Sequence, residues 1–235
     1  MVDCGVPAII LHQWRISPFC GKVRRVLEHK RLAYDVVDYN GLRARKASGL
    51  SDAGKLPVLE YDGERVQDSS DIAAFLERKH PEPRLVPSDP VLRARTQFWE
   101  DWADESLYWF EVYFRFAYPA ARARAVALLS EGRPKLERML LAPVVKRMYK
   151  AKLAAQGIGR IGRDRVEAKF ASHVDALEIV LGDRRWLVGD DCTIADIAVA
   201  SQLAEIARTS HLAPDLASRA KLTEWLGRVP SGDLS

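Results

Sequence analysis

A serine and a cysteine stand three residues apart in Ser17-Pro18-Phe19-Cys20, directly after a short apolar run at residues 8–14. Proline after serine is typical of the first position of a helix, so the motif is predicted to lie at a strand-to-helix turn. The unpaired N–H groups and the dipole of a helix N-terminus favour a negative charge. A free thiol has a pKa of about 8.5. Lowering this pKa until most of the thiol is ionised near pH 7 requires roughly 2.7 kcal/mol, which one hydroxyl donor and a helix N-terminus can supply together.

Ser17 can act in two ways at this turn. It can donate a hydrogen bond to the sulfur of a bound thiol, or it can simply cap the helix, and the motif alone leaves both interpretations open. Ser17 occupies the place of the exposed cysteine in a Cys-Pro-Phe-Cys redox pair and cannot form a disulfide, which excludes dithiol redox catalysis by this motif. Cys20 lies one turn into the predicted helix and is expected to be a structural or weakly reactive secondary thiol.

Lys55-Leu56-Pro57 precedes a predicted strand. This order suits a cis proline in a tight turn, which would leave the backbone of Leu56 free to pair with an extended peptide. An ordinary trans proline that opens a strand is the alternative.

Asp68-Ser69-Ser70-Asp71 opens a predicted helix. The hydroxyl and backbone N–H of Ser69 could bind a carboxylate, and Asp68 could hold an ammonium group. A plain capping motif is the alternative.

The elements that must position these motifs can be read from the first third of the chain. Strands are predicted at residues 8–14 and 34–39, parallel because a helix of about a dozen residues separates them. Two further strands, at residues 57–61 and 65–67, form a hairpin around Asp62-Gly63, and a helix follows at residues 69–79. The order β-α-β followed by β-β-α is that of the thioredoxin fold.

A proline-rich linker at residues 82–90 divides the chain into two predicted domains, a thioredoxin-like α/β domain at 1–81 and an all-helical domain at 91–235. In the second domain a helix is predicted at residues 91–116, stopped by Pro119. A basic stretch to residue 155 is expected to be interrupted by Pro134 and Pro143, and a helix at 164–181 is followed by two shorter ones.

The composition indicates an ordinary globular protein of two small domains, with 48% apolar and 29% charged residues in 235. Three widely spaced cysteines, Cys4, Cys20 and Cys192, favour neither a disulfide framework nor a zinc site, so we expect no metal and a reducing, cytoplasmic location. No membrane span and no signal peptide are predicted. The net charge of +4 is scattered over several helices, and we expect no nucleic-acid partner.

The three motifs, in this order and spacing, resemble the glutathione transferase superfamily over nearly the whole chain. The resemblance implies that Ser17 faces the sulfur of glutathione, the co-substrate. It also implies contacts for the rest of glutathione: the glycyl and cysteinyl parts with Lys55 and Leu56 beside a cis Pro57, and the γ-glutamyl part with Asp68 and Ser69. Thr193-Ile194-Ala195-Asp196 is similar to the capping box of the family's core helix, whose role is folding.

Further segments are similar to particular branches of the superfamily. Residues 17–24, with Leu107-Tyr108-Trp109 and residues 156–160, resemble the branch of failed-axon-connections proteins, metaxins and the membrane-associated prostaglandin E synthase. Residues 16–19 are similar to serine-type bacterial β-etherases, which cleave lignin aryl ethers with glutathione.

The resemblance implies a detoxifying transferase in which the glutathione thiolate attacks a small hydrophobic electrophile. Phe19, Tyr108 and Trp109 are candidates to line the pocket for that substrate, although aromatic residues at helical spacing can equally fill the core. The alternatives are a binding module without catalysis and a glutathione-dependent reductase or β-etherase. The family's habit of pairing subunits implies a homodimer.

Overall fold

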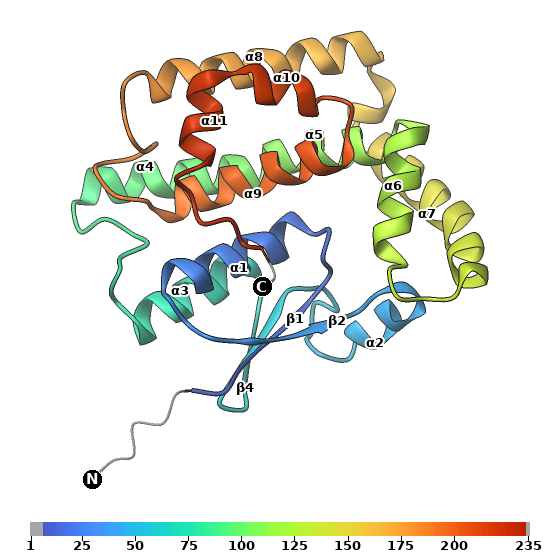
Figure 1. Cartoon of the computed structure of the whole chain (residues 1–235), viewed down its shortest axis with the longest axis horizontal. Helices are drawn as coiled ribbons and strands as arrows, with labels where there is room; N and C mark the ends of the chain where they lie inside the picture. Colours follow the sequence, from blue (N-terminus) through green and yellow to red (C-terminus); the bar gives the residue numbers. More distant parts are fainter. Residues whose placement is uncertain (1–6, 234–235) are drawn as a thin grey trace.

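The N-terminal part of the protein is built on one small mixed β-sheet (Figure 1). The computed structural model describes residues 7–233, so Cys4 lies outside the described residues. The strand order is β2-β1-β3-β4; β1 is parallel to β2 and antiparallel to β3, and β3 and β4 form the predicted hairpin. The strands are β1 (Ile9–Gln13), β2 (Asp35–Asp38), β3 (Val58–Tyr61) and β4 (Glu64–Gln67).

Two helices, α1 (Pro18–His29) and α3 (Ser69–Lys79), complete the predicted thioredoxin-like order. Apolar residues of α1 such as Val23 and Val26 are fully buried, and in Figure 1 this helix lies between the sheet and the C-terminal helices. A 3₁₀ turn (Gly41–Arg43) and the four-residue helix α2 (Ala44–Ala47) lie between β2 and β3 and were not predicted. The predicted fold class, a thioredoxin-like domain followed by helices, is confirmed.

The rest of the described chain is helical, as predicted. Its elements are α4 (Pro90–Asp101), a π-helical turn (Trp102–Leu107), α5 (Tyr108–Phe116), α6 (Pro119–Leu129), α7 (Lys135–Gln156), a 3₁₀ turn (Ile158–Arg160), α8 (Arg163–Leu181), α9 (Ile194–Thr209), α10 (Ala213–Ser218) and α11 (Ala220–Leu226).

Several helix boundaries differ from the prediction. Pro143 was expected to interrupt the basic stretch, but it lies inside α7. An internal proline costs a helix about 3 kcal/mol, and buried residues on both sides of it, Glu137 and Val145, hold the helix together here. Pro119 is the first residue of α6, a position that needs no N–H donor. Three helices follow α8 rather than two, because α10 and α11 are separated at Arg219.

Residues 82–89 contain no helix or strand and connect α3 to α4. The Lys30 ammonium fastens this connection to α1, because it donates to the carbonyl oxygens of His80 (2.7 Å) and Pro83 (2.6 Å). The domain limits at residues 81 and 91 stay a prediction. Among the helices of residues 7–233, none combines the length and the apolar character that crossing a membrane requires.

The centre of the helical domain is α9, which is buried on almost every side and packs on α1, α4 and α5. The predicted capping box opens it. The Asp196 carboxylate accepts hydrogen bonds from the N–H and hydroxyl of Thr193 (both 3.0 Å), from the N–H of Leu187 (2.9 Å) and from the Trp225 indole (2.9 Å). One side chain therefore joins the start of α9 to the preceding loop and to α11.

Asp196→Ala is expected to lower the free energy of unfolding by about 3 kcal/mol, because it leaves buried donors without acceptors. Urea unfolding followed by circular dichroism measures the change. The exposed Asp190, in the loop before α9, provides the control Asp190→Ala, which should stay within about 0.5 kcal/mol of the wild type. Equal losses for the two variants would contradict the structural role of Asp196.

Candidate functional site

The three predicted motifs leave the sheet at the same edge. Val58, the first residue of β3, pairs with His12 near the end of β1 and with Gln67 at the end of β4. The Ser17 loop follows β1, Leu56-Pro57 directly precedes β3, and Asp68-Ser69 directly follows β4. The strand register therefore brings together segments that are more than 50 residues apart along the chain.

Ser17 is the N-cap of α1 and is buried. Its hydroxyl oxygen accepts a hydrogen bond from the N–H of Cys20 at 3.3 Å, and its own N–H donates to the carbonyl oxygen of Trp14 at 3.0 Å. A hydroxyl that accepts through its oxygen still has its proton to donate. The two interpretations of Ser17, helix cap and donor to a thiolate, are therefore compatible.

The loop that carries Ser17 is held by contacts from both parts of the molecule. The carbonyl oxygen of Arg15 accepts from the Arg208 guanidinium of α9 at 2.9 Å. The guanidinium of Arg15 in turn donates to Asp38 of β2 (3.0 Å) and to Glu131, between α6 and α7 (3.2 Å). The position of the Ser17 hydroxyl is thus set before any ligand binds.

Cys20 lies behind Ser17 and is fully buried. Its sulfur accepts from the N–H of Trp14 at 3.4 Å and packs in a small apolar cluster with Leu56 and Val58. Burial raises the pKa of the Cys20 thiol to about 11, so it stays protonated at neutral pH. Cys20 joins the Ser17 turn to the Leu56 turn by packing.

The peptide bond between Leu56 and Pro57 is cis, and Leu56 is buried whereas Lys55 is exposed. Neither the N–H nor the carbonyl oxygen of Leu56 has a hydrogen-bond partner within residues 7–233. This turn therefore offers one backbone donor and one backbone acceptor to an extended ligand.

The start of α3 forms the third part of the edge. Asp68 caps α3: its Oδ1 accepts from the N–H groups of Ser70 (2.8 Å) and Asp71 (3.4 Å). Ser69 is buried, and its N–H, at the first helical position, is not one of the two that Asp68 caps. The helix N-terminus can thus bind a carboxylate through Ser69, while the exposed Asp68 adds a negative charge beside it.

A buried lysine that the sequence analysis missed lies beside this helix start. The Lys22 ammonium donates to Ser70 Oγ (2.9 Å), Glu100 (2.6 Å) and Asp104 (2.6 Å), and so connects α1, α3 and the helix that begins at Pro90. Burial alone would lower the pKa of Lys22, but Asp104 and Glu100 outweigh it and raise the pKa above its usual value. Lys22 is therefore a permanent cation inside the molecule.

The predicted pocket aromatics form one cluster, which Phe19 joins to the first turn of α1. The rings of Phe19 and Tyr108 lie 4.9 Å apart, and those of Tyr108 and Trp109 5.4 Å apart. Lys152 of α7, which was not predicted, donates to the Tyr108 hydroxyl at 3.0 Å. Burial raises the pKa of Tyr108 to about 12, so its hydroxyl stays protonated. This cluster, which we call the aromatic wall, thus combines the rings of Phe19, Tyr108 and Trp109 with Lys152.

Two hollows in the described residues lie away from Ser17. One, of about 360 Å³, is lined by Trp99, Trp102 and His173 between α4 and α8; the other, of about 230 Å³, lies beside Ser70 and Glu77. No group of three metal-ligating side chains occurs within residues 7–233.

Lys22 and Lys152 were not predicted, because a single lysine in a helical sequence pattern does not indicate whether it is buried or which residues it contacts.

Comparison with known proteins gives two family-model matches. Residues 11–84 match the model "Glutathione S-transferase, N-terminal domain", and residues 161–228 match "Glutathione S-transferase, C-terminal domain". Together these matches span more than half of the chain. Residues 85–160, which include α6 and α7, lie between them.

Individual proteins agree with the family matches. A glutathione S-transferase of Pseudomonas putida is 27% identical over 173 residues, which cover 74% of this chain and 69% of that protein. Protein LigF of Sphingobium is 25% identical over 185 residues, covering 77% and 71%, and the crystal structure of β-etherase LigF has a TM-score of 0.66 at 21% identity, with 94% of each chain covered.

A glutathione S-transferase structure from Rhodospirillum rubrum has a TM-score of 0.66 at 25% identity, with 95% of this chain and 88% of that one covered. The two family-model matches and the three similar proteins therefore all indicate the same superfamily. The chain belongs to the glutathione transferase superfamily of enzymes.

Proposed function

We propose that the protein is a glutathione transferase in which Ser17 stabilises the glutathione thiolate for attack on a hydrophobic electrophile. The observation that carries the proposal is the geometry of Ser17: its oxygen accepts the N–H of Cys20, so its proton is left to point at a ligand. The hydroxyl stands at the N-terminus of α1, whose dipole also favours a negative charge.

Glutathione is an extended tripeptide with a carboxylate at each end, and the sheet edge matches it in order. The free backbone groups of Leu56 pair with its central cysteinyl residue, next to the cis Pro57. Ser69 at the start of α3 binds the γ-glutamyl carboxylate, and Asp68 attracts its ammonium group. The exposed Lys55 faces the glycyl carboxylate.

In the reaction the thiolate sulfur donates an electron pair to an electrophilic carbon and a C–S bond forms. The leaving group departs with the electrons of the broken bond, or, in an addition, those electrons move to the neighbouring atom and take up a proton. Phe19, Tyr108 and Trp109 give the second substrate an apolar wall beside the sulfur. Lys152 supplies a positive charge at the edge of that wall.

Glutathione-dependent ether cleavage or reduction is a second candidate, favoured by the likeness to protein LigF, whose crystal structure is described as that of a β-etherase. In that case a first attack by the thiolate is followed by exchange with a second glutathione. A stable thioether product supports conjugation, whereas oxidised glutathione supports reduction or ether cleavage. Glutathione binding without turnover of any electrophile would make the protein a binding module of the same fold. The branch of failed-axon-connections proteins and metaxins stays a prediction.

We further propose that the protein acts in the cytoplasm as a homodimer. Cys20 and Cys192 are both unpaired and buried, as suits a reducing compartment. The dimer is proposed to pair through α4 and α8, where Phe98 and Ile179 are exposed by 76% and 80% around the larger hollow.

Ser17→Ala is expected to raise the pKa of bound glutathione by about one to two units and to slow conjugation 10- to 100-fold at pH 7, roughly 1.4 to 2.7 kcal/mol. Because the thiol of the variant ionises at higher pH, the deficit should shrink as the pH rises. The pH–rate profile with an aromatic electrophile such as chlorodinitrobenzene measures both effects. Ser17→Thr, which keeps the hydroxyl, is the matched control. An unchanged profile for Ser17→Ala would exclude the role given to Ser17.

Ser69→Ala is expected to weaken glutathione binding about tenfold, because it removes a hydrogen bond to a carboxylate worth about 1.5 kcal/mol. Calorimetric titration at neutral pH measures the dissociation constant. Ser88→Ala, an exposed serine in the connection between α3 and α4, is the control and should bind as the wild type does. Equal affinities for all three proteins would place glutathione elsewhere.

Cys20→Ala is expected to change the conjugation rate less than about threefold, since the buried thiol has a pKa of about 11 and does not ionise at neutral pH. Iodoacetamide at pH 8 should leave Cys20 unmodified in the folded protein and modify it after denaturation, as peptide mass spectrometry can show. Complete loss of activity in a folded Cys20→Ala protein would instead indicate a cysteine mechanism.

A further inference from the structure

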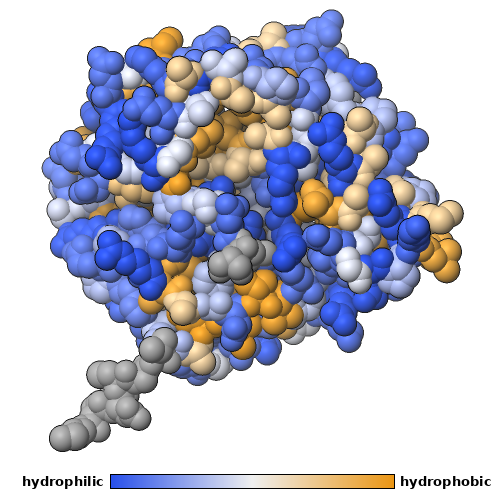
Figure 2. All heavy atoms as spheres, in the orientation of Figure 1, coloured by the Kyte–Doolittle hydropathy of each residue, from blue (hydrophilic) through white to orange (hydrophobic). Residues whose placement is uncertain are grey.

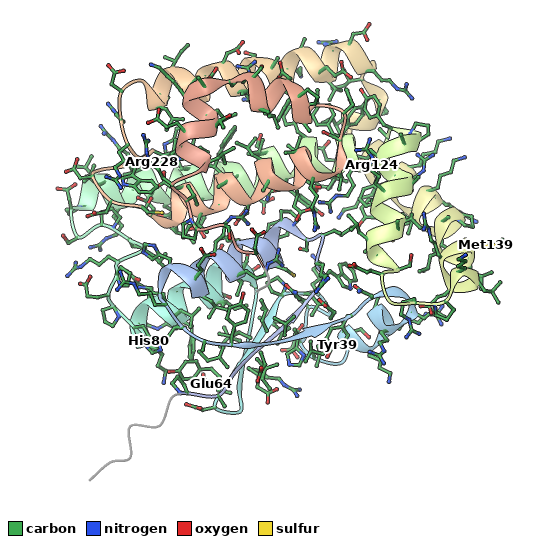
Figure 3. The ribbon with its side chains drawn as sticks, viewed as in Figure 1. Tyr39, Glu64, His80, Arg124, Met139 and Arg228 are labelled. Carbon is green, nitrogen blue, oxygen red and sulfur yellow. The ribbon has the colours of Figure 1, made fainter. Side chains whose placement is uncertain are left out.

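One helix exposes far more apolar surface than the others. Within residues 7–233, half of the large apolar side chains that are strongly exposed belong to α7. They lie at helical spacing along one side, with exposed fractions between 52% and 70%, and we call them the α7 stripe: Leu136, Met139, Leu140, Val144 and Met148. In Figure 3, Met139 points away from the body of the molecule, and Figure 2 shows apolar atoms at the same outer edge.

The opposite side of α7 is packed against the rest of the protein. The helix therefore already has a buried face, and the stripe is a second apolar face. Val145 and Leu153 are buried, and the ring of Tyr149 stacks on Phe116 of α5 at 3.5 Å. The carboxylate of Glu137 accepts from the N–H of Leu42, in the turn after β2. The helix is therefore anchored to both domains with the stripe facing outward.

The side chains around the stripe are cationic. Six basic residues of α7 are exposed: Lys135, Arg138, Lys146, Arg147, Lys150 and Lys152. The only acidic residue of α7, Glu137, is buried and paired with Arg133 at 3.0 Å. The outward side of α7 thus joins apolar side chains to unopposed positive charge.

This combination selects the kind of partner. A second copy of the chain would bring the same positive charges against one another, which opposes pairing through the stripe. A helix with an apolar face and a border of Lys and Arg suits the interface of a membrane, where apolar side chains enter the acyl boundary and cations meet lipid phosphates. The stripe spans about 18 Å from Leu136 to Met148, long enough to lie flat on such a surface.

We propose that α7 is an interfacial helix that docks the protein onto membranes containing anionic lipid. It lies in the plane of the surface and does not cross the bilayer, in agreement with the absence of a spanning helix among the described residues. The stripe lies in residues 85–160, between the two segments that the family models match.

Co-sedimentation of the full-length protein with vesicles tests the proposal. One set of vesicles contains phosphatidylcholine alone, and the other contains phosphatidylcholine and phosphatidylserine in equal amounts. The wild type should bind the anionic vesicles at least about tenfold more tightly than the neutral ones, and added salt should weaken binding. No binding to the anionic vesicles at low salt would overturn the proposal.

Two double variants separate the apolar and charged contributions. Met139→Glu with Val144→Glu removes the centre of the stripe, and Lys146→Glu with Lys150→Glu reverses its border; each should lower binding about tenfold or more. Val91→Glu, an exposed apolar residue at the start of α4, is the matched control and should bind as the wild type does. Circular dichroism checks that every variant is folded, which is expected because all these side chains are exposed.

Wild-type binding by a folded Met139→Glu, Val144→Glu protein would overturn the role of the stripe. The other candidate partner for the stripe is a second copy of the chain, and analytical sedimentation of the protein without lipid tests for it. If the wild type forms a larger species that this double variant loses, the stripe is an interface between copies and the membrane proposal is wrong. An unchanged oligomeric state in that comparison supports docking to lipid.

Discussion

The relation between the two halves of the molecule depends on one buried ammonium group. Lys22 of α1 is 1% exposed and shares its donors among Ser70 of α3 and the carboxylates of Glu100 and Asp104. A lysine taken out of water in this way is tolerated only when every donor finds an acceptor and the opposite charge lies close by. Because these acceptors come from different elements, the requirement fixes α1 and α3 against the first helix of the second domain. The same fixation places Phe19, three residues before Lys22, against the ring of Tyr108.

The sheet edge shows how few constraints are needed to assemble a site. Strand register alone aligns the end of β1, the start of β3 and the end of β4. Each of the three segments then exposes backbone or hydroxyl groups, because each is a turn or the first residue of a helix, where the chain's own hydrogen bonding is incomplete. Cys20 contributes apolar packing between two of these turns. Its burial raises the pKa of the thiol, so Cys20 is unreactive at neutral pH.

Sequence patterns predicted the parts of this structure that local chemistry decides. The hairpin follows from Asp62-Gly63, which both adopt positive φ in the turn, and the start of α9 follows from the Thr193-Asp196 capping box. The motifs around Ser17 and Ser69 could be placed for the same reason. What escaped prediction depends on tertiary contacts: Lys22 and Lys152 gain their partners only when distant helices pack, and α7 continues through Pro143 because the residues on either side are anchored elsewhere.

The helical hairpin formed by α6 and α7 also depends on tertiary contacts for its position. Gly41 adopts a positive φ of +64°, and a Cβ there would stand 2.0 Å from the carboxylate of Glu137, so the turn after β2 receives α7 closely only because this residue is glycine. Contact at that turn, and at Arg15 through Glu131, ties the hairpin to the loop that carries Ser17. An apolar stripe held so rigidly outward loses little conformational entropy when a partner covers it, because the helix is already formed and fixed.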